Sequence, residues 1–250
     1  MRVAQKREGT KMKAAYLTPA ITMFHADGSL DLDSQKKLYE NLIAQGIDGI
    51  LVEGSSSEFF AMNMEQRRAM AKFAIDTIDH RVKLIVGTSS MVADEIISFS
   101  NYCLEQGADA VMILPPYYFH FDDEALLQYY DHLAGAINGP IYIYNFPANS
   151  PHTVVKLAKL HSNIVGMKDT ISGMDHTREL IKVVKSELPD FEIYSGFDDN
   201  FAHNVLSGGD GCIGALSNVV PELCAAWVNA FRNNDLEGIA KGQQTINRLM

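Results

Sequence analysis

A lysine at the end of a short apolar run is the first feature of this sequence that could do chemistry. Lys168 follows the run 164–167 and precedes the polar residues Asp169 and Thr170. A short apolar run between turn signals is typical of a buried strand. A lysine at the end of such a strand loses hydration, so more of its uncharged amine can attack a carbonyl carbon. The alternative is a solvated lysine that caps the strand, and this run alone does not decide between the two.

Other apolar runs also end in residues with hydroxyl, amide or carboxylate groups. If the strands are parallel, all these ends share one edge with Lys168. Lysine, phenol and serine side chains together favour imine chemistry on a keto acid. The lysine forms the imine, and the hydroxyls carry the protons that imine formation, carbon–carbon cleavage and release require. The polar ends are Gly-Ser-Ser-Ser-Glu at 54–58, Pro-Pro-Tyr-Tyr at 115–118, Tyr-Asn-Phe-Pro at 144–147 and Gly-Phe-Asp-Asp at 196–199.

Each of these residues also has a purely structural interpretation. Tyr144 by itself is more often a core tyrosine whose hydroxyl has found a partner, and Ser55–Ser57 suits a helix cap or an anion-binding turn. The Asp198–Asp199 pair suits the first turn of a helix, where carboxylates interact favourably with the helix dipole. The Tyr117–Tyr118 pair suits a subunit contact. Joint placement at five strand ends favours the catalytic interpretation over these.

Short apolar runs alternate with segments of helical periodicity along the whole chain. Several runs are nearly continuous Val, Ile, Leu and Met, as expected for strands covered on both faces. Strands that alternate with helices predict parallel βαβ units, and eight such units predict an α/β fold, a single-domain (β/α)8 TIM barrel. An open doubly wound sheet is the alternative, but the segment 18–22 is not the glycine-rich turn that it favours. The eight predicted strands are 14–17, 47–52, 82–86, 108–114, 140–144, 164–167, 191–194 and 211–215.

Local signals place some of the helix ends. Asn63 and Gln66 have the spacing of a capping box. Gly46 and Gly107 follow amphipathic segments and predict their ends, since glycine readily adopts the left-handed conformation. We expect residues 1–13 to form a flexible N-terminal arm, residues 14–233 the barrel, and residues 234–250 the start of a shortened C-terminal helical extension.

Composition narrows the class of protein. The 250 residues are 47% hydrophobic and 21% charged, with a net charge of −10, which is typical of a globular domain. Nucleic acid is not an expected partner, because phosphate binding needs a basic face. A membrane span is not expected either, because no apolar stretch reaches the ~18 residues that it needs, and residues 1–13 lack the apolar segment of a secretory signal. Three separated cysteines suggest reduced thiols and a cytoplasmic location.

The sequence resembles the pyruvate-dependent class I aldolases and lyases, the family that includes dihydrodipicolinate synthase and N-acetylneuraminate lyase. The similarity runs from about Ala14 to the helix after Pro221. It implies a TIM barrel, no cofactor, a homotetramer built as a dimer of dimers, and a small-molecule substrate, pyruvate with an aldehyde or the 2-keto-3-deoxy acid that they form. The motifs that carry it are 54–58, Tyr-Asn-x-Pro at 144–147, Gly-x-Lys at 166–168, Ser-Gly-Phe-Asp-Asp at 195–199 and Gly-Gly-Asp-Gly at 208–211.

The resemblance also implies a role for each site residue. Lys168 matches the Schiff-base lysine and Tyr144 the proton-relay phenol. Ser55 and Ser56 match the positions that hold the substrate carboxylate and pass protons to the tyrosine, and Tyr118 matches a tyrosine lent across a dimer contact. We therefore expect the catalytic residues Lys168, Tyr144, Ser56 and Tyr118, and the substrate-binding residues Ser55, Ser56, Thr170, Gly196, Asp198, Asp199 and Ala215.

Departures from the family pattern point to a substrate. The synthase branch has an arginine two residues after the proline at 147, whereas this chain has Asn149, so a second substrate carboxylate would lose its bidentate partner. The Asp198–Asp199 pair suits polyol hydroxyls and repels phosphate. We expect an unphosphorylated 2-keto-3-deoxy sugar acid, as for 2-keto-3-deoxygluconate-type aldolases. The alternatives are N-acetylneuraminate lyase, 4-hydroxy-tetrahydrodipicolinate synthase and a catalytically silent barrel that binds sugar acids.

Two further features bear on activity. Ser57 stands where the family usually has glycine; if that position needs a positive φ, the serine is strained by about 1 kcal/mol or more and the loop is reshaped. A metal-dependent aldolase would need ligands such as His25, His120 and His203 with the Asp198–Asp199 pair. No two histidines have helical i, i+4 spacing, so we expect no metal site.

Overall fold

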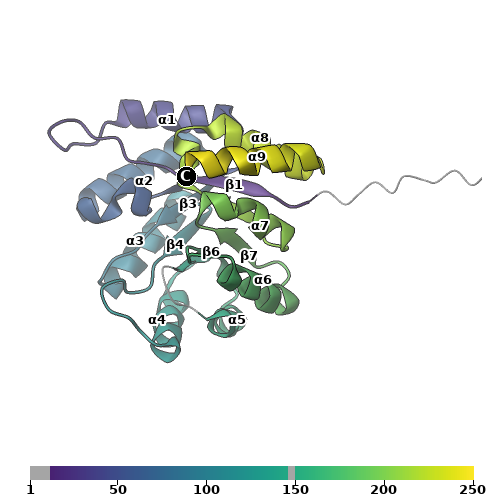
Figure 1. Ribbon diagram of the computed structural model, residues 1–250. Coiled ribbons are helices and arrows are strands. Elements are labelled where there is room, and N and C mark those ends of the chain that lie inside the picture. The colour runs from purple at the N-terminus through teal and green to yellow at the C-terminus, as the bar shows by residue number, and fades with distance from the viewer. Residues whose placement is uncertain (1–11, 146–149) are drawn as a thin grey trace, which may run out of the picture.

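The chain forms a closed barrel of parallel strands surrounded by helices. A computed structural model describes residues 12–145 and 150–250 (Figure 1). Within this part of the chain the strands pair in sequence order, and β8 pairs back to β1. The predicted TIM barrel is therefore confirmed. The strands are β1 (Ala15–Pro19), β2 (Gly49–Val52), β3 (Lys83–Gly87), β4 (Ala110–Ile113), β5 (Ile141–Asn145), β6 (Ile164–Asp169), β7 (Glu192–Ser195) and β8 (Gly211–Ile213).

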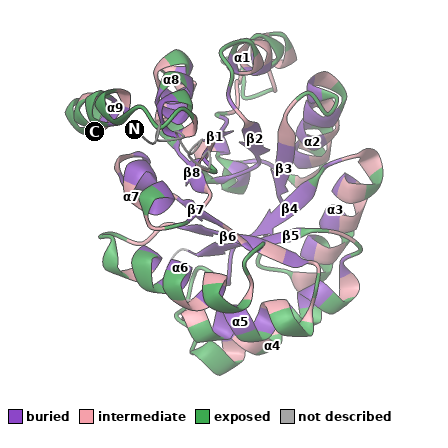
Figure 2. Cartoon of the chain, turned by 90° about the vertical axis from the view of Figure 1, so that its right-hand side faces the viewer, coloured by how far each residue is buried: buried purple, intermediate pink, exposed green. Residues whose placement is uncertain are grey.

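A helix follows each strand and lies on the outside of the barrel (Figure 2). This arrangement brings the carboxyl ends of all the strands to one rim and their amino ends to the other. The helices are α1 (Leu32–Ala44), α2 (Met64–Ile78), α3 (Ala93–Gln106), α4 (Asp123–Ala136), α5 (Pro151–Leu160), α6 (Asp175–Glu187), α7 (Phe201–Leu206), α8 (Pro221–Arg232) and α9 (Leu236–Leu249).

The predicted strands agree with the observed ones to within two residues at each end. The runs at 47–52 and 108–114 are longer than their strands because Ile47, Ala108 and Leu114 are buried just outside the ladder. β5 and β6 extend further than predicted, to Asn145 and Asp169, since polar residues can continue the backbone pairing. These two polar ends lie beside the site described below.

The predicted helix ends are also confirmed. Asn63 caps α2: its side chain accepts from the Gln66 amide at 2.9 Å, and its own amide donates to the Gln66 side chain at 3.0 Å. Gly46 follows α1 with φ 86°, and Gly107 ends α3 with φ 112°. Local sequence therefore fixes where these helices meet the barrel.

The amino-end rim of the barrel is closed by a polar cluster. The Lys83 ammonium lies 2.8 Å from the Glu192 carboxylate, to which the phenols of Tyr142 and Tyr194 donate at 2.7 and 2.6 Å. Burial alone would raise the pKa of Glu192, but the bonds from Lys83 and the phenols lower it below its usual range. We call this cluster of Lys83, Tyr142, Glu192 and Tyr194 the floor of the barrel. A substrate would therefore enter the barrel interior from the carboxyl-end rim.

The last helix, α9, packs on the outside of α8. The buried side chains of Ile239 and Ile246 face the core, and the Trp227 indole of α8 donates to the Ile239 carbonyl at 3.0 Å. Across residues 12–145 and 150–250, every helix is too short or too polar to cross a membrane.

Candidate active site

Lys168 and Tyr144 lie side by side inside the barrel, near the carboxyl-end rim. They are register partners on the neighbouring strands β6 and β5, so their side chains point to the same face. The Lys168 amine lies 4.3 Å from the centroid of the Tyr144 ring. Both side chains are buried, with 5% and 7% of their surface exposed. An amine and a phenol are thus held together in an enclosed space.

The surroundings of Tyr144 favour its phenolate. Burial alone would raise the pKa of the phenol, but the nearby Lys168 ammonium and the hydroxyl of Ser55 outweigh it, with a smaller contribution from Thr170. The pKa of Tyr144 therefore lies below its ordinary value of 10. A phenol tuned in this way exchanges protons more readily near neutral pH.

The serine loop after β2 reaches this pair. Ser55–Ser57 form a single 3-10 turn. The Ser55 hydroxyl lies at the rim and bonds to the Tyr144 phenol. Ser56 is half-buried in the same turn. The structure therefore brings the Ser55 side chain to Tyr144.

Ser57 is not strained, contrary to the conditional expectation for a position where the family usually has glycine. The residues with positive φ here are Glu53 and Glu58, at 58° and 56°, and Ser57 is not one of them. The buried Ser57 hydroxyl donates to the Ala20 carbonyl at 2.6 Å and accepts from the Gly54 amide at 3.2 Å. The serine therefore ties the loop to the end of β1.

Thr170 and Gly196 form the neighbouring part of the rim. The Thr170 hydroxyl is buried and lies beside the Tyr144 phenol, whose pKa it helps to lower. A Cβ atom at Gly196 would collide with this hydroxyl, so only glycine fits there. A buried hydroxyl beside the lysine and the phenol can contact a polar group of a bound molecule.

The Asp198–Asp199 pair splits between two environments. Asp198 is buried, accepts from the Tyr16 hydroxyl, and accepts from the Leu216 amide at 3.0 Å through the same oxygen, Oδ1. Asp199 is half-buried and lines a hollow beside α7 and α9. Ala215 is exposed after β8. One Asp198 oxygen is thus engaged within the protein.

Tyr118 lies on the surface of this chain. It is 77% exposed on the connection between β4 and α4 and stacks edge-on with Phe119. Asn149, and with it the end of the Tyr-Asn-x-Pro motif, lies outside the described residues. Within residues 12–145 and 150–250, no three histidine, cysteine or acidic side chains come together as a metal-binding group.

A buried ion pair behind the serine loop was not expected from the sequence. Arg67 of α2 donates to Glu53 at 2.7 Å and to the carbonyls of Ser89 and Gly87 at 2.8 and 2.9 Å. It ties the carboxyl ends of β2 and β3 to α2, just before the Gly54–Ser57 turn. The signal was available, because Arg67 lies on the buried stripe of α2, where a charged residue needs a buried partner.

This pair gives a prediction for pH dependence. Burial raises the pKa of Glu53 from 4.5 to about 7, although Arg67 opposes the shift. A raised pKa means that the folded state binds the proton more tightly, so the stability contributed by protonated Glu53 is lost as pH rises from about 4.5 to about 7. We expect Glu53→Gln to flatten this part of the Tm-against-pH curve, measured by thermal unfolding from pH 4.5 to 8. Parallel curves for wild type and variant would contradict the prediction; exposed Asp76→Asn serves as control.

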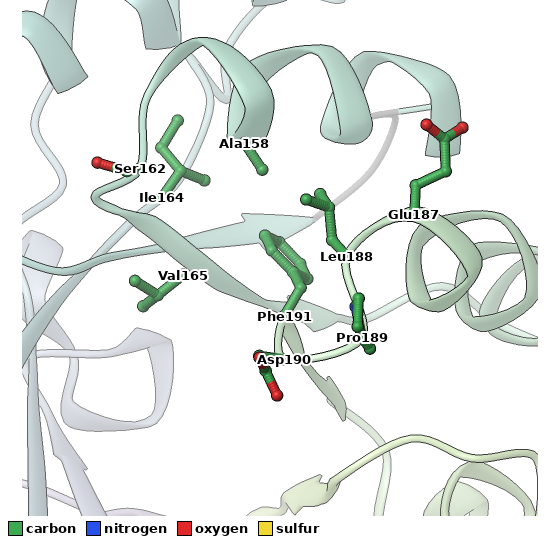
Figure 3. A pocket seen from close by; sticks show the side chains of 9 residues that line it. All are labelled: Ala158, Ser162, Ile164, Val165, Glu187, Leu188, Pro189, Asp190 and Phe191. Carbon is green, nitrogen blue, oxygen red and sulfur yellow. The ribbon is translucent and has the colours of Figure 1, made fainter.

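A separate hollow lies at the opposite end of the barrel. It is bounded by Ala158 on α5, the start of β6, and the connection between α6 and β7 that holds Leu188 and Phe191 (Figure 3). Ile164 in its wall is four residues before Lys168, roughly 13 Å along the strand. This hollow is therefore not part of the Lys168 site.

Comparison with known proteins agrees with this geometry. The Dihydrodipicolinate synthetase family model matches residues 12–250. The chain belongs to the dihydrodipicolinate synthetase family. The family predicted from the sequence is thus confirmed, and with it the class of reaction, that of a carbon–carbon lyase.

Several members of the family are similar over most of the chain. The putative 2-dehydro-3-deoxy-D-gluconate aldolase YagE of Escherichia coli K12 is 37% identical over 92% of this chain and 78% of its own length. The probable 2-dehydro-3-deoxy-D-pentonate aldolase YjhH of the same organism is 36% identical over 90% of this chain and 77% of its own. The crystal structure of YagE in complex with pyruvate has a TM-score of 0.91 at 36% identity, and the match covers 94% of this chain and 81% of that one.

A structure from the synthase branch is less similar. The dihydrodipicolinate synthase of Bacteroides thetaiotaomicron has a TM-score of 0.89 at 26% identity, and the match covers 96% of this chain and 82% of that one. The barrel is thus shared with this synthase at lower sequence identity. By sequence, the 4-hydroxy-tetrahydrodipicolinate synthase of Kosmotoga olearia is 35% identical over 87% of this chain and 75% of its own length.

Proposed function

We propose that this protein is a class I aldolase that forms a Schiff base between Lys168 and pyruvate. The observation that carries the proposal is the buried Lys168 amine, 4.3 Å from the Tyr144 ring centroid at the open end of the barrel. The amine adds to the keto carbon of the substrate, water leaves, and an iminium ion remains. This iminium accepts the electron pair of the carbon–carbon bond that breaks.

Tyr144 carries the protons in this proposal. In the cleavage direction its phenolate takes the proton of the C4 hydroxyl, the C3–C4 bond breaks, and the aldehyde leaves behind an enamine. Protonation of the enamine at C3 and addition of water then release pyruvate and the free amine. The lowered pKa of Tyr144 supports this role. Ser55 and Ser56 are assigned to the substrate carboxylate and to proton exchange with the phenol.

The substrate in this proposal is an unphosphorylated 2-keto-3-deoxy sugar acid. The names of YagE and YjhH support this class, and the pyruvate complex of YagE supports pyruvate as the keto component. The rim from Gly196 to Asp199, with Ala215 and Thr170, would receive the polyol tail. Because Asp198 Oδ1 already accepts from the protein, its second oxygen is the one assigned to a substrate hydroxyl.

We also propose a homotetramer built as a dimer of dimers, with Tyr118 at the dimer contact. The exposed aromatic residues Tyr117, Tyr118 and Phe119 next to the rim support an interface there. A cytoplasmic location is part of the proposal and is supported by the three buried free cysteines, Cys103, Cys212 and Cys224.

A substrate panel tests the proposed function. We expect 2-keto-3-deoxygluconate to be cleaved with the highest kcat/KM, and 4-hydroxy-2-oxo acids without a polyol tail to be cleaved at least ~10-fold less efficiently, since they lose hydrogen bonds to the rim. Pyruvate release is measured with a coupled dehydrogenase. Preferred cleavage of N-acetylneuraminate, or condensation of pyruvate with aspartate semialdehyde alone, would assign one of the alternative reactions. A trapped imine without turnover would indicate a silent binding barrel.

A further inference from the structure

Asp169 follows Lys168 in β6 and points to the opposite face of the strand. Its side chain is only 1% exposed. Successive residues of a strand face opposite sides, so Lys168 lies inside the barrel while Asp169 lies between the barrel and α6. A buried carboxylate in this position needs several donors to offset its lost hydration.

Three donors converge on this carboxylate. The Asn145 amide of β5 donates to Oδ1 at 2.8 Å. The Thr177 hydroxyl of α6 donates to Oδ2 at 2.6 Å, and His176 Nδ1 lies 3.1 Å from the same oxygen. Asp169 therefore joins the end of β5, the end of β6 and the first turn of α6.

The strand register places the Asp169 contacts directly beside the reacting pair. Asn145 is paired with Asp169, and Tyr144 with Lys168, in the same ladder. The outer pair is thus one residue from the inner pair on each strand. Backbone bonds continue the connection: the Thr170 amide donates to the Asn145 carbonyl at 3.0 Å, and the Gly196 amide donates to the Asp169 carbonyl at 2.7 Å.

We propose that Asp169 is a positioning residue, which fixes the separation of the Lys168 amine and the Tyr144 phenol by clamping the ends of β5 and β6 from the outside. The inference rests on the proposed function, because the separation matters only if the two groups exchange protons. Proton transfer requires hydrogen-bond distance, and misplacement of a reacting group by about 1 Å can lower a rate ~10²-fold. The carboxylate acts without touching the substrate.

Two substitutions of Asp169 test this clamp, by which Asp169 joins the ends of β5 and β6. The first removes the carboxylate, and the second replaces it with an amide that keeps one oxygen. We expect Asp169→Ala to lower kcat ~10- to 100-fold, while KM for the sugar acid changes less than ~3-fold, because the rim that holds the substrate is retained. Asp169→Asn keeps an oxygen that accepts from Asn145 and is expected to recover most of the lost kcat. A purely structural role would not produce this split or this recovery.

Asp109 offers a matched control at the other end of the barrel. Its carboxylate accepts from the Leu84 amide at 2.7 Å and lies 3.5 Å from His80 Nδ1. Asp109→Ala is expected to lower Tm and to leave kcat within ~2-fold of wild type. An equal fall of kcat in Asp109→Ala, an unchanged kcat in Asp169→Ala, or no recovery in Asp169→Asn would each overturn the proposal.

Two further measurements distinguish failure of the Asp169 proposal from a loss of folding and from failure of the proposed function. If Asp169→Ala does not fold, Thr177→Val removes the 2.6 Å bond to the carboxylate at nearly constant volume. We expect a several-fold fall in kcat from this variant, and an unchanged kcat would overturn the clamp.

Borohydride trapping with pyruvate is run on wild type in parallel. No adduct in wild type means that the proposed function fails, whereas normal trapping and turnover in both wild type and Asp169→Ala means that only the clamp fails.

Discussion

Lys168→Ala is expected to abolish the covalent pyruvate adduct and the aldolase activity together. The amine is the only group at the rim that this mechanism assigns to imine formation, and without the iminium the electrons of the breaking bond have no acceptor. Loss of a covalent nucleophile lowers turnover by several powers of ten, so we expect kcat to fall ~10³-fold or more. Mass spectrometry after borohydride reduction with pyruvate measures the adduct, which adds roughly 72 Da by atom counting on the imine.

Lys83→Ala is the matched control for this variant. Lys83 is the other lysine of the barrel interior in the described residues, bound to Glu192 at the floor. We expect Lys83→Ala to be less stable, since Glu192 loses its counter-charge, but to retain the adduct on Lys168. An adduct of undiminished yield in Lys168→Ala would show that another amine reacts and would refute the assignment.

The strands and the reacting pair could be predicted because both follow from local patterns. Continuous apolar runs mark strands covered on both faces, and parallel pairing sends their ends to one rim. Tyr144 ends one such run and Lys168 follows another, so the parallel fold was enough to predict that the two residues lie near each other at one rim. The cluster of Lys83 and Glu192 at the amino-end rim had no local signal in the sequence, because the closed topology brings these two residues together.

The supporting contacts could not be predicted in the same way. Tyr16 bonds to Asp198 across 182 residues, and no local pattern carries such a pairing. The left-handed residues flank the serine loop at Glu53 and Glu58 rather than falling on Ser57, which is why the strain expected at Ser57 is absent. Arg67 on a buried helix stripe carried a signal for its ion pair with Glu53, but the partner became evident only from the fold.

Tyr144→Phe is expected to keep slow imine formation while lowering kcat ~10²-fold or more. The substitution removes only the hydroxyl, so the ring beside Lys168 stays in place and the amine can still add to pyruvate. What is lost is the group that takes the proton of the substrate hydroxyl as the carbon–carbon bond breaks, and general acid–base catalysis contributes about 10²- to 10⁴-fold. Single-turnover trapping measures imine formation, and steady-state pyruvate release measures turnover.

Tyr142→Phe separates this role from that of a buried tyrosine in general. Tyr142 lies two residues earlier on β5, faces the same interior and donates to Glu192 at 2.7 Å. Loss of the Tyr142 hydroxyl is expected to lower Tm while kcat stays near the wild-type value, because the amino-end rim is remote from the imine.

The pH profile of kcat adds a second criterion. Since the pKa of Tyr144 lies below 10, wild-type kcat is expected to rise with pH through that pKa, and Tyr144→Phe is expected to lose the rise. Wild-type turnover by Tyr144→Phe, or an equal loss of kcat in Tyr142→Phe, would show that the proton passes through another group.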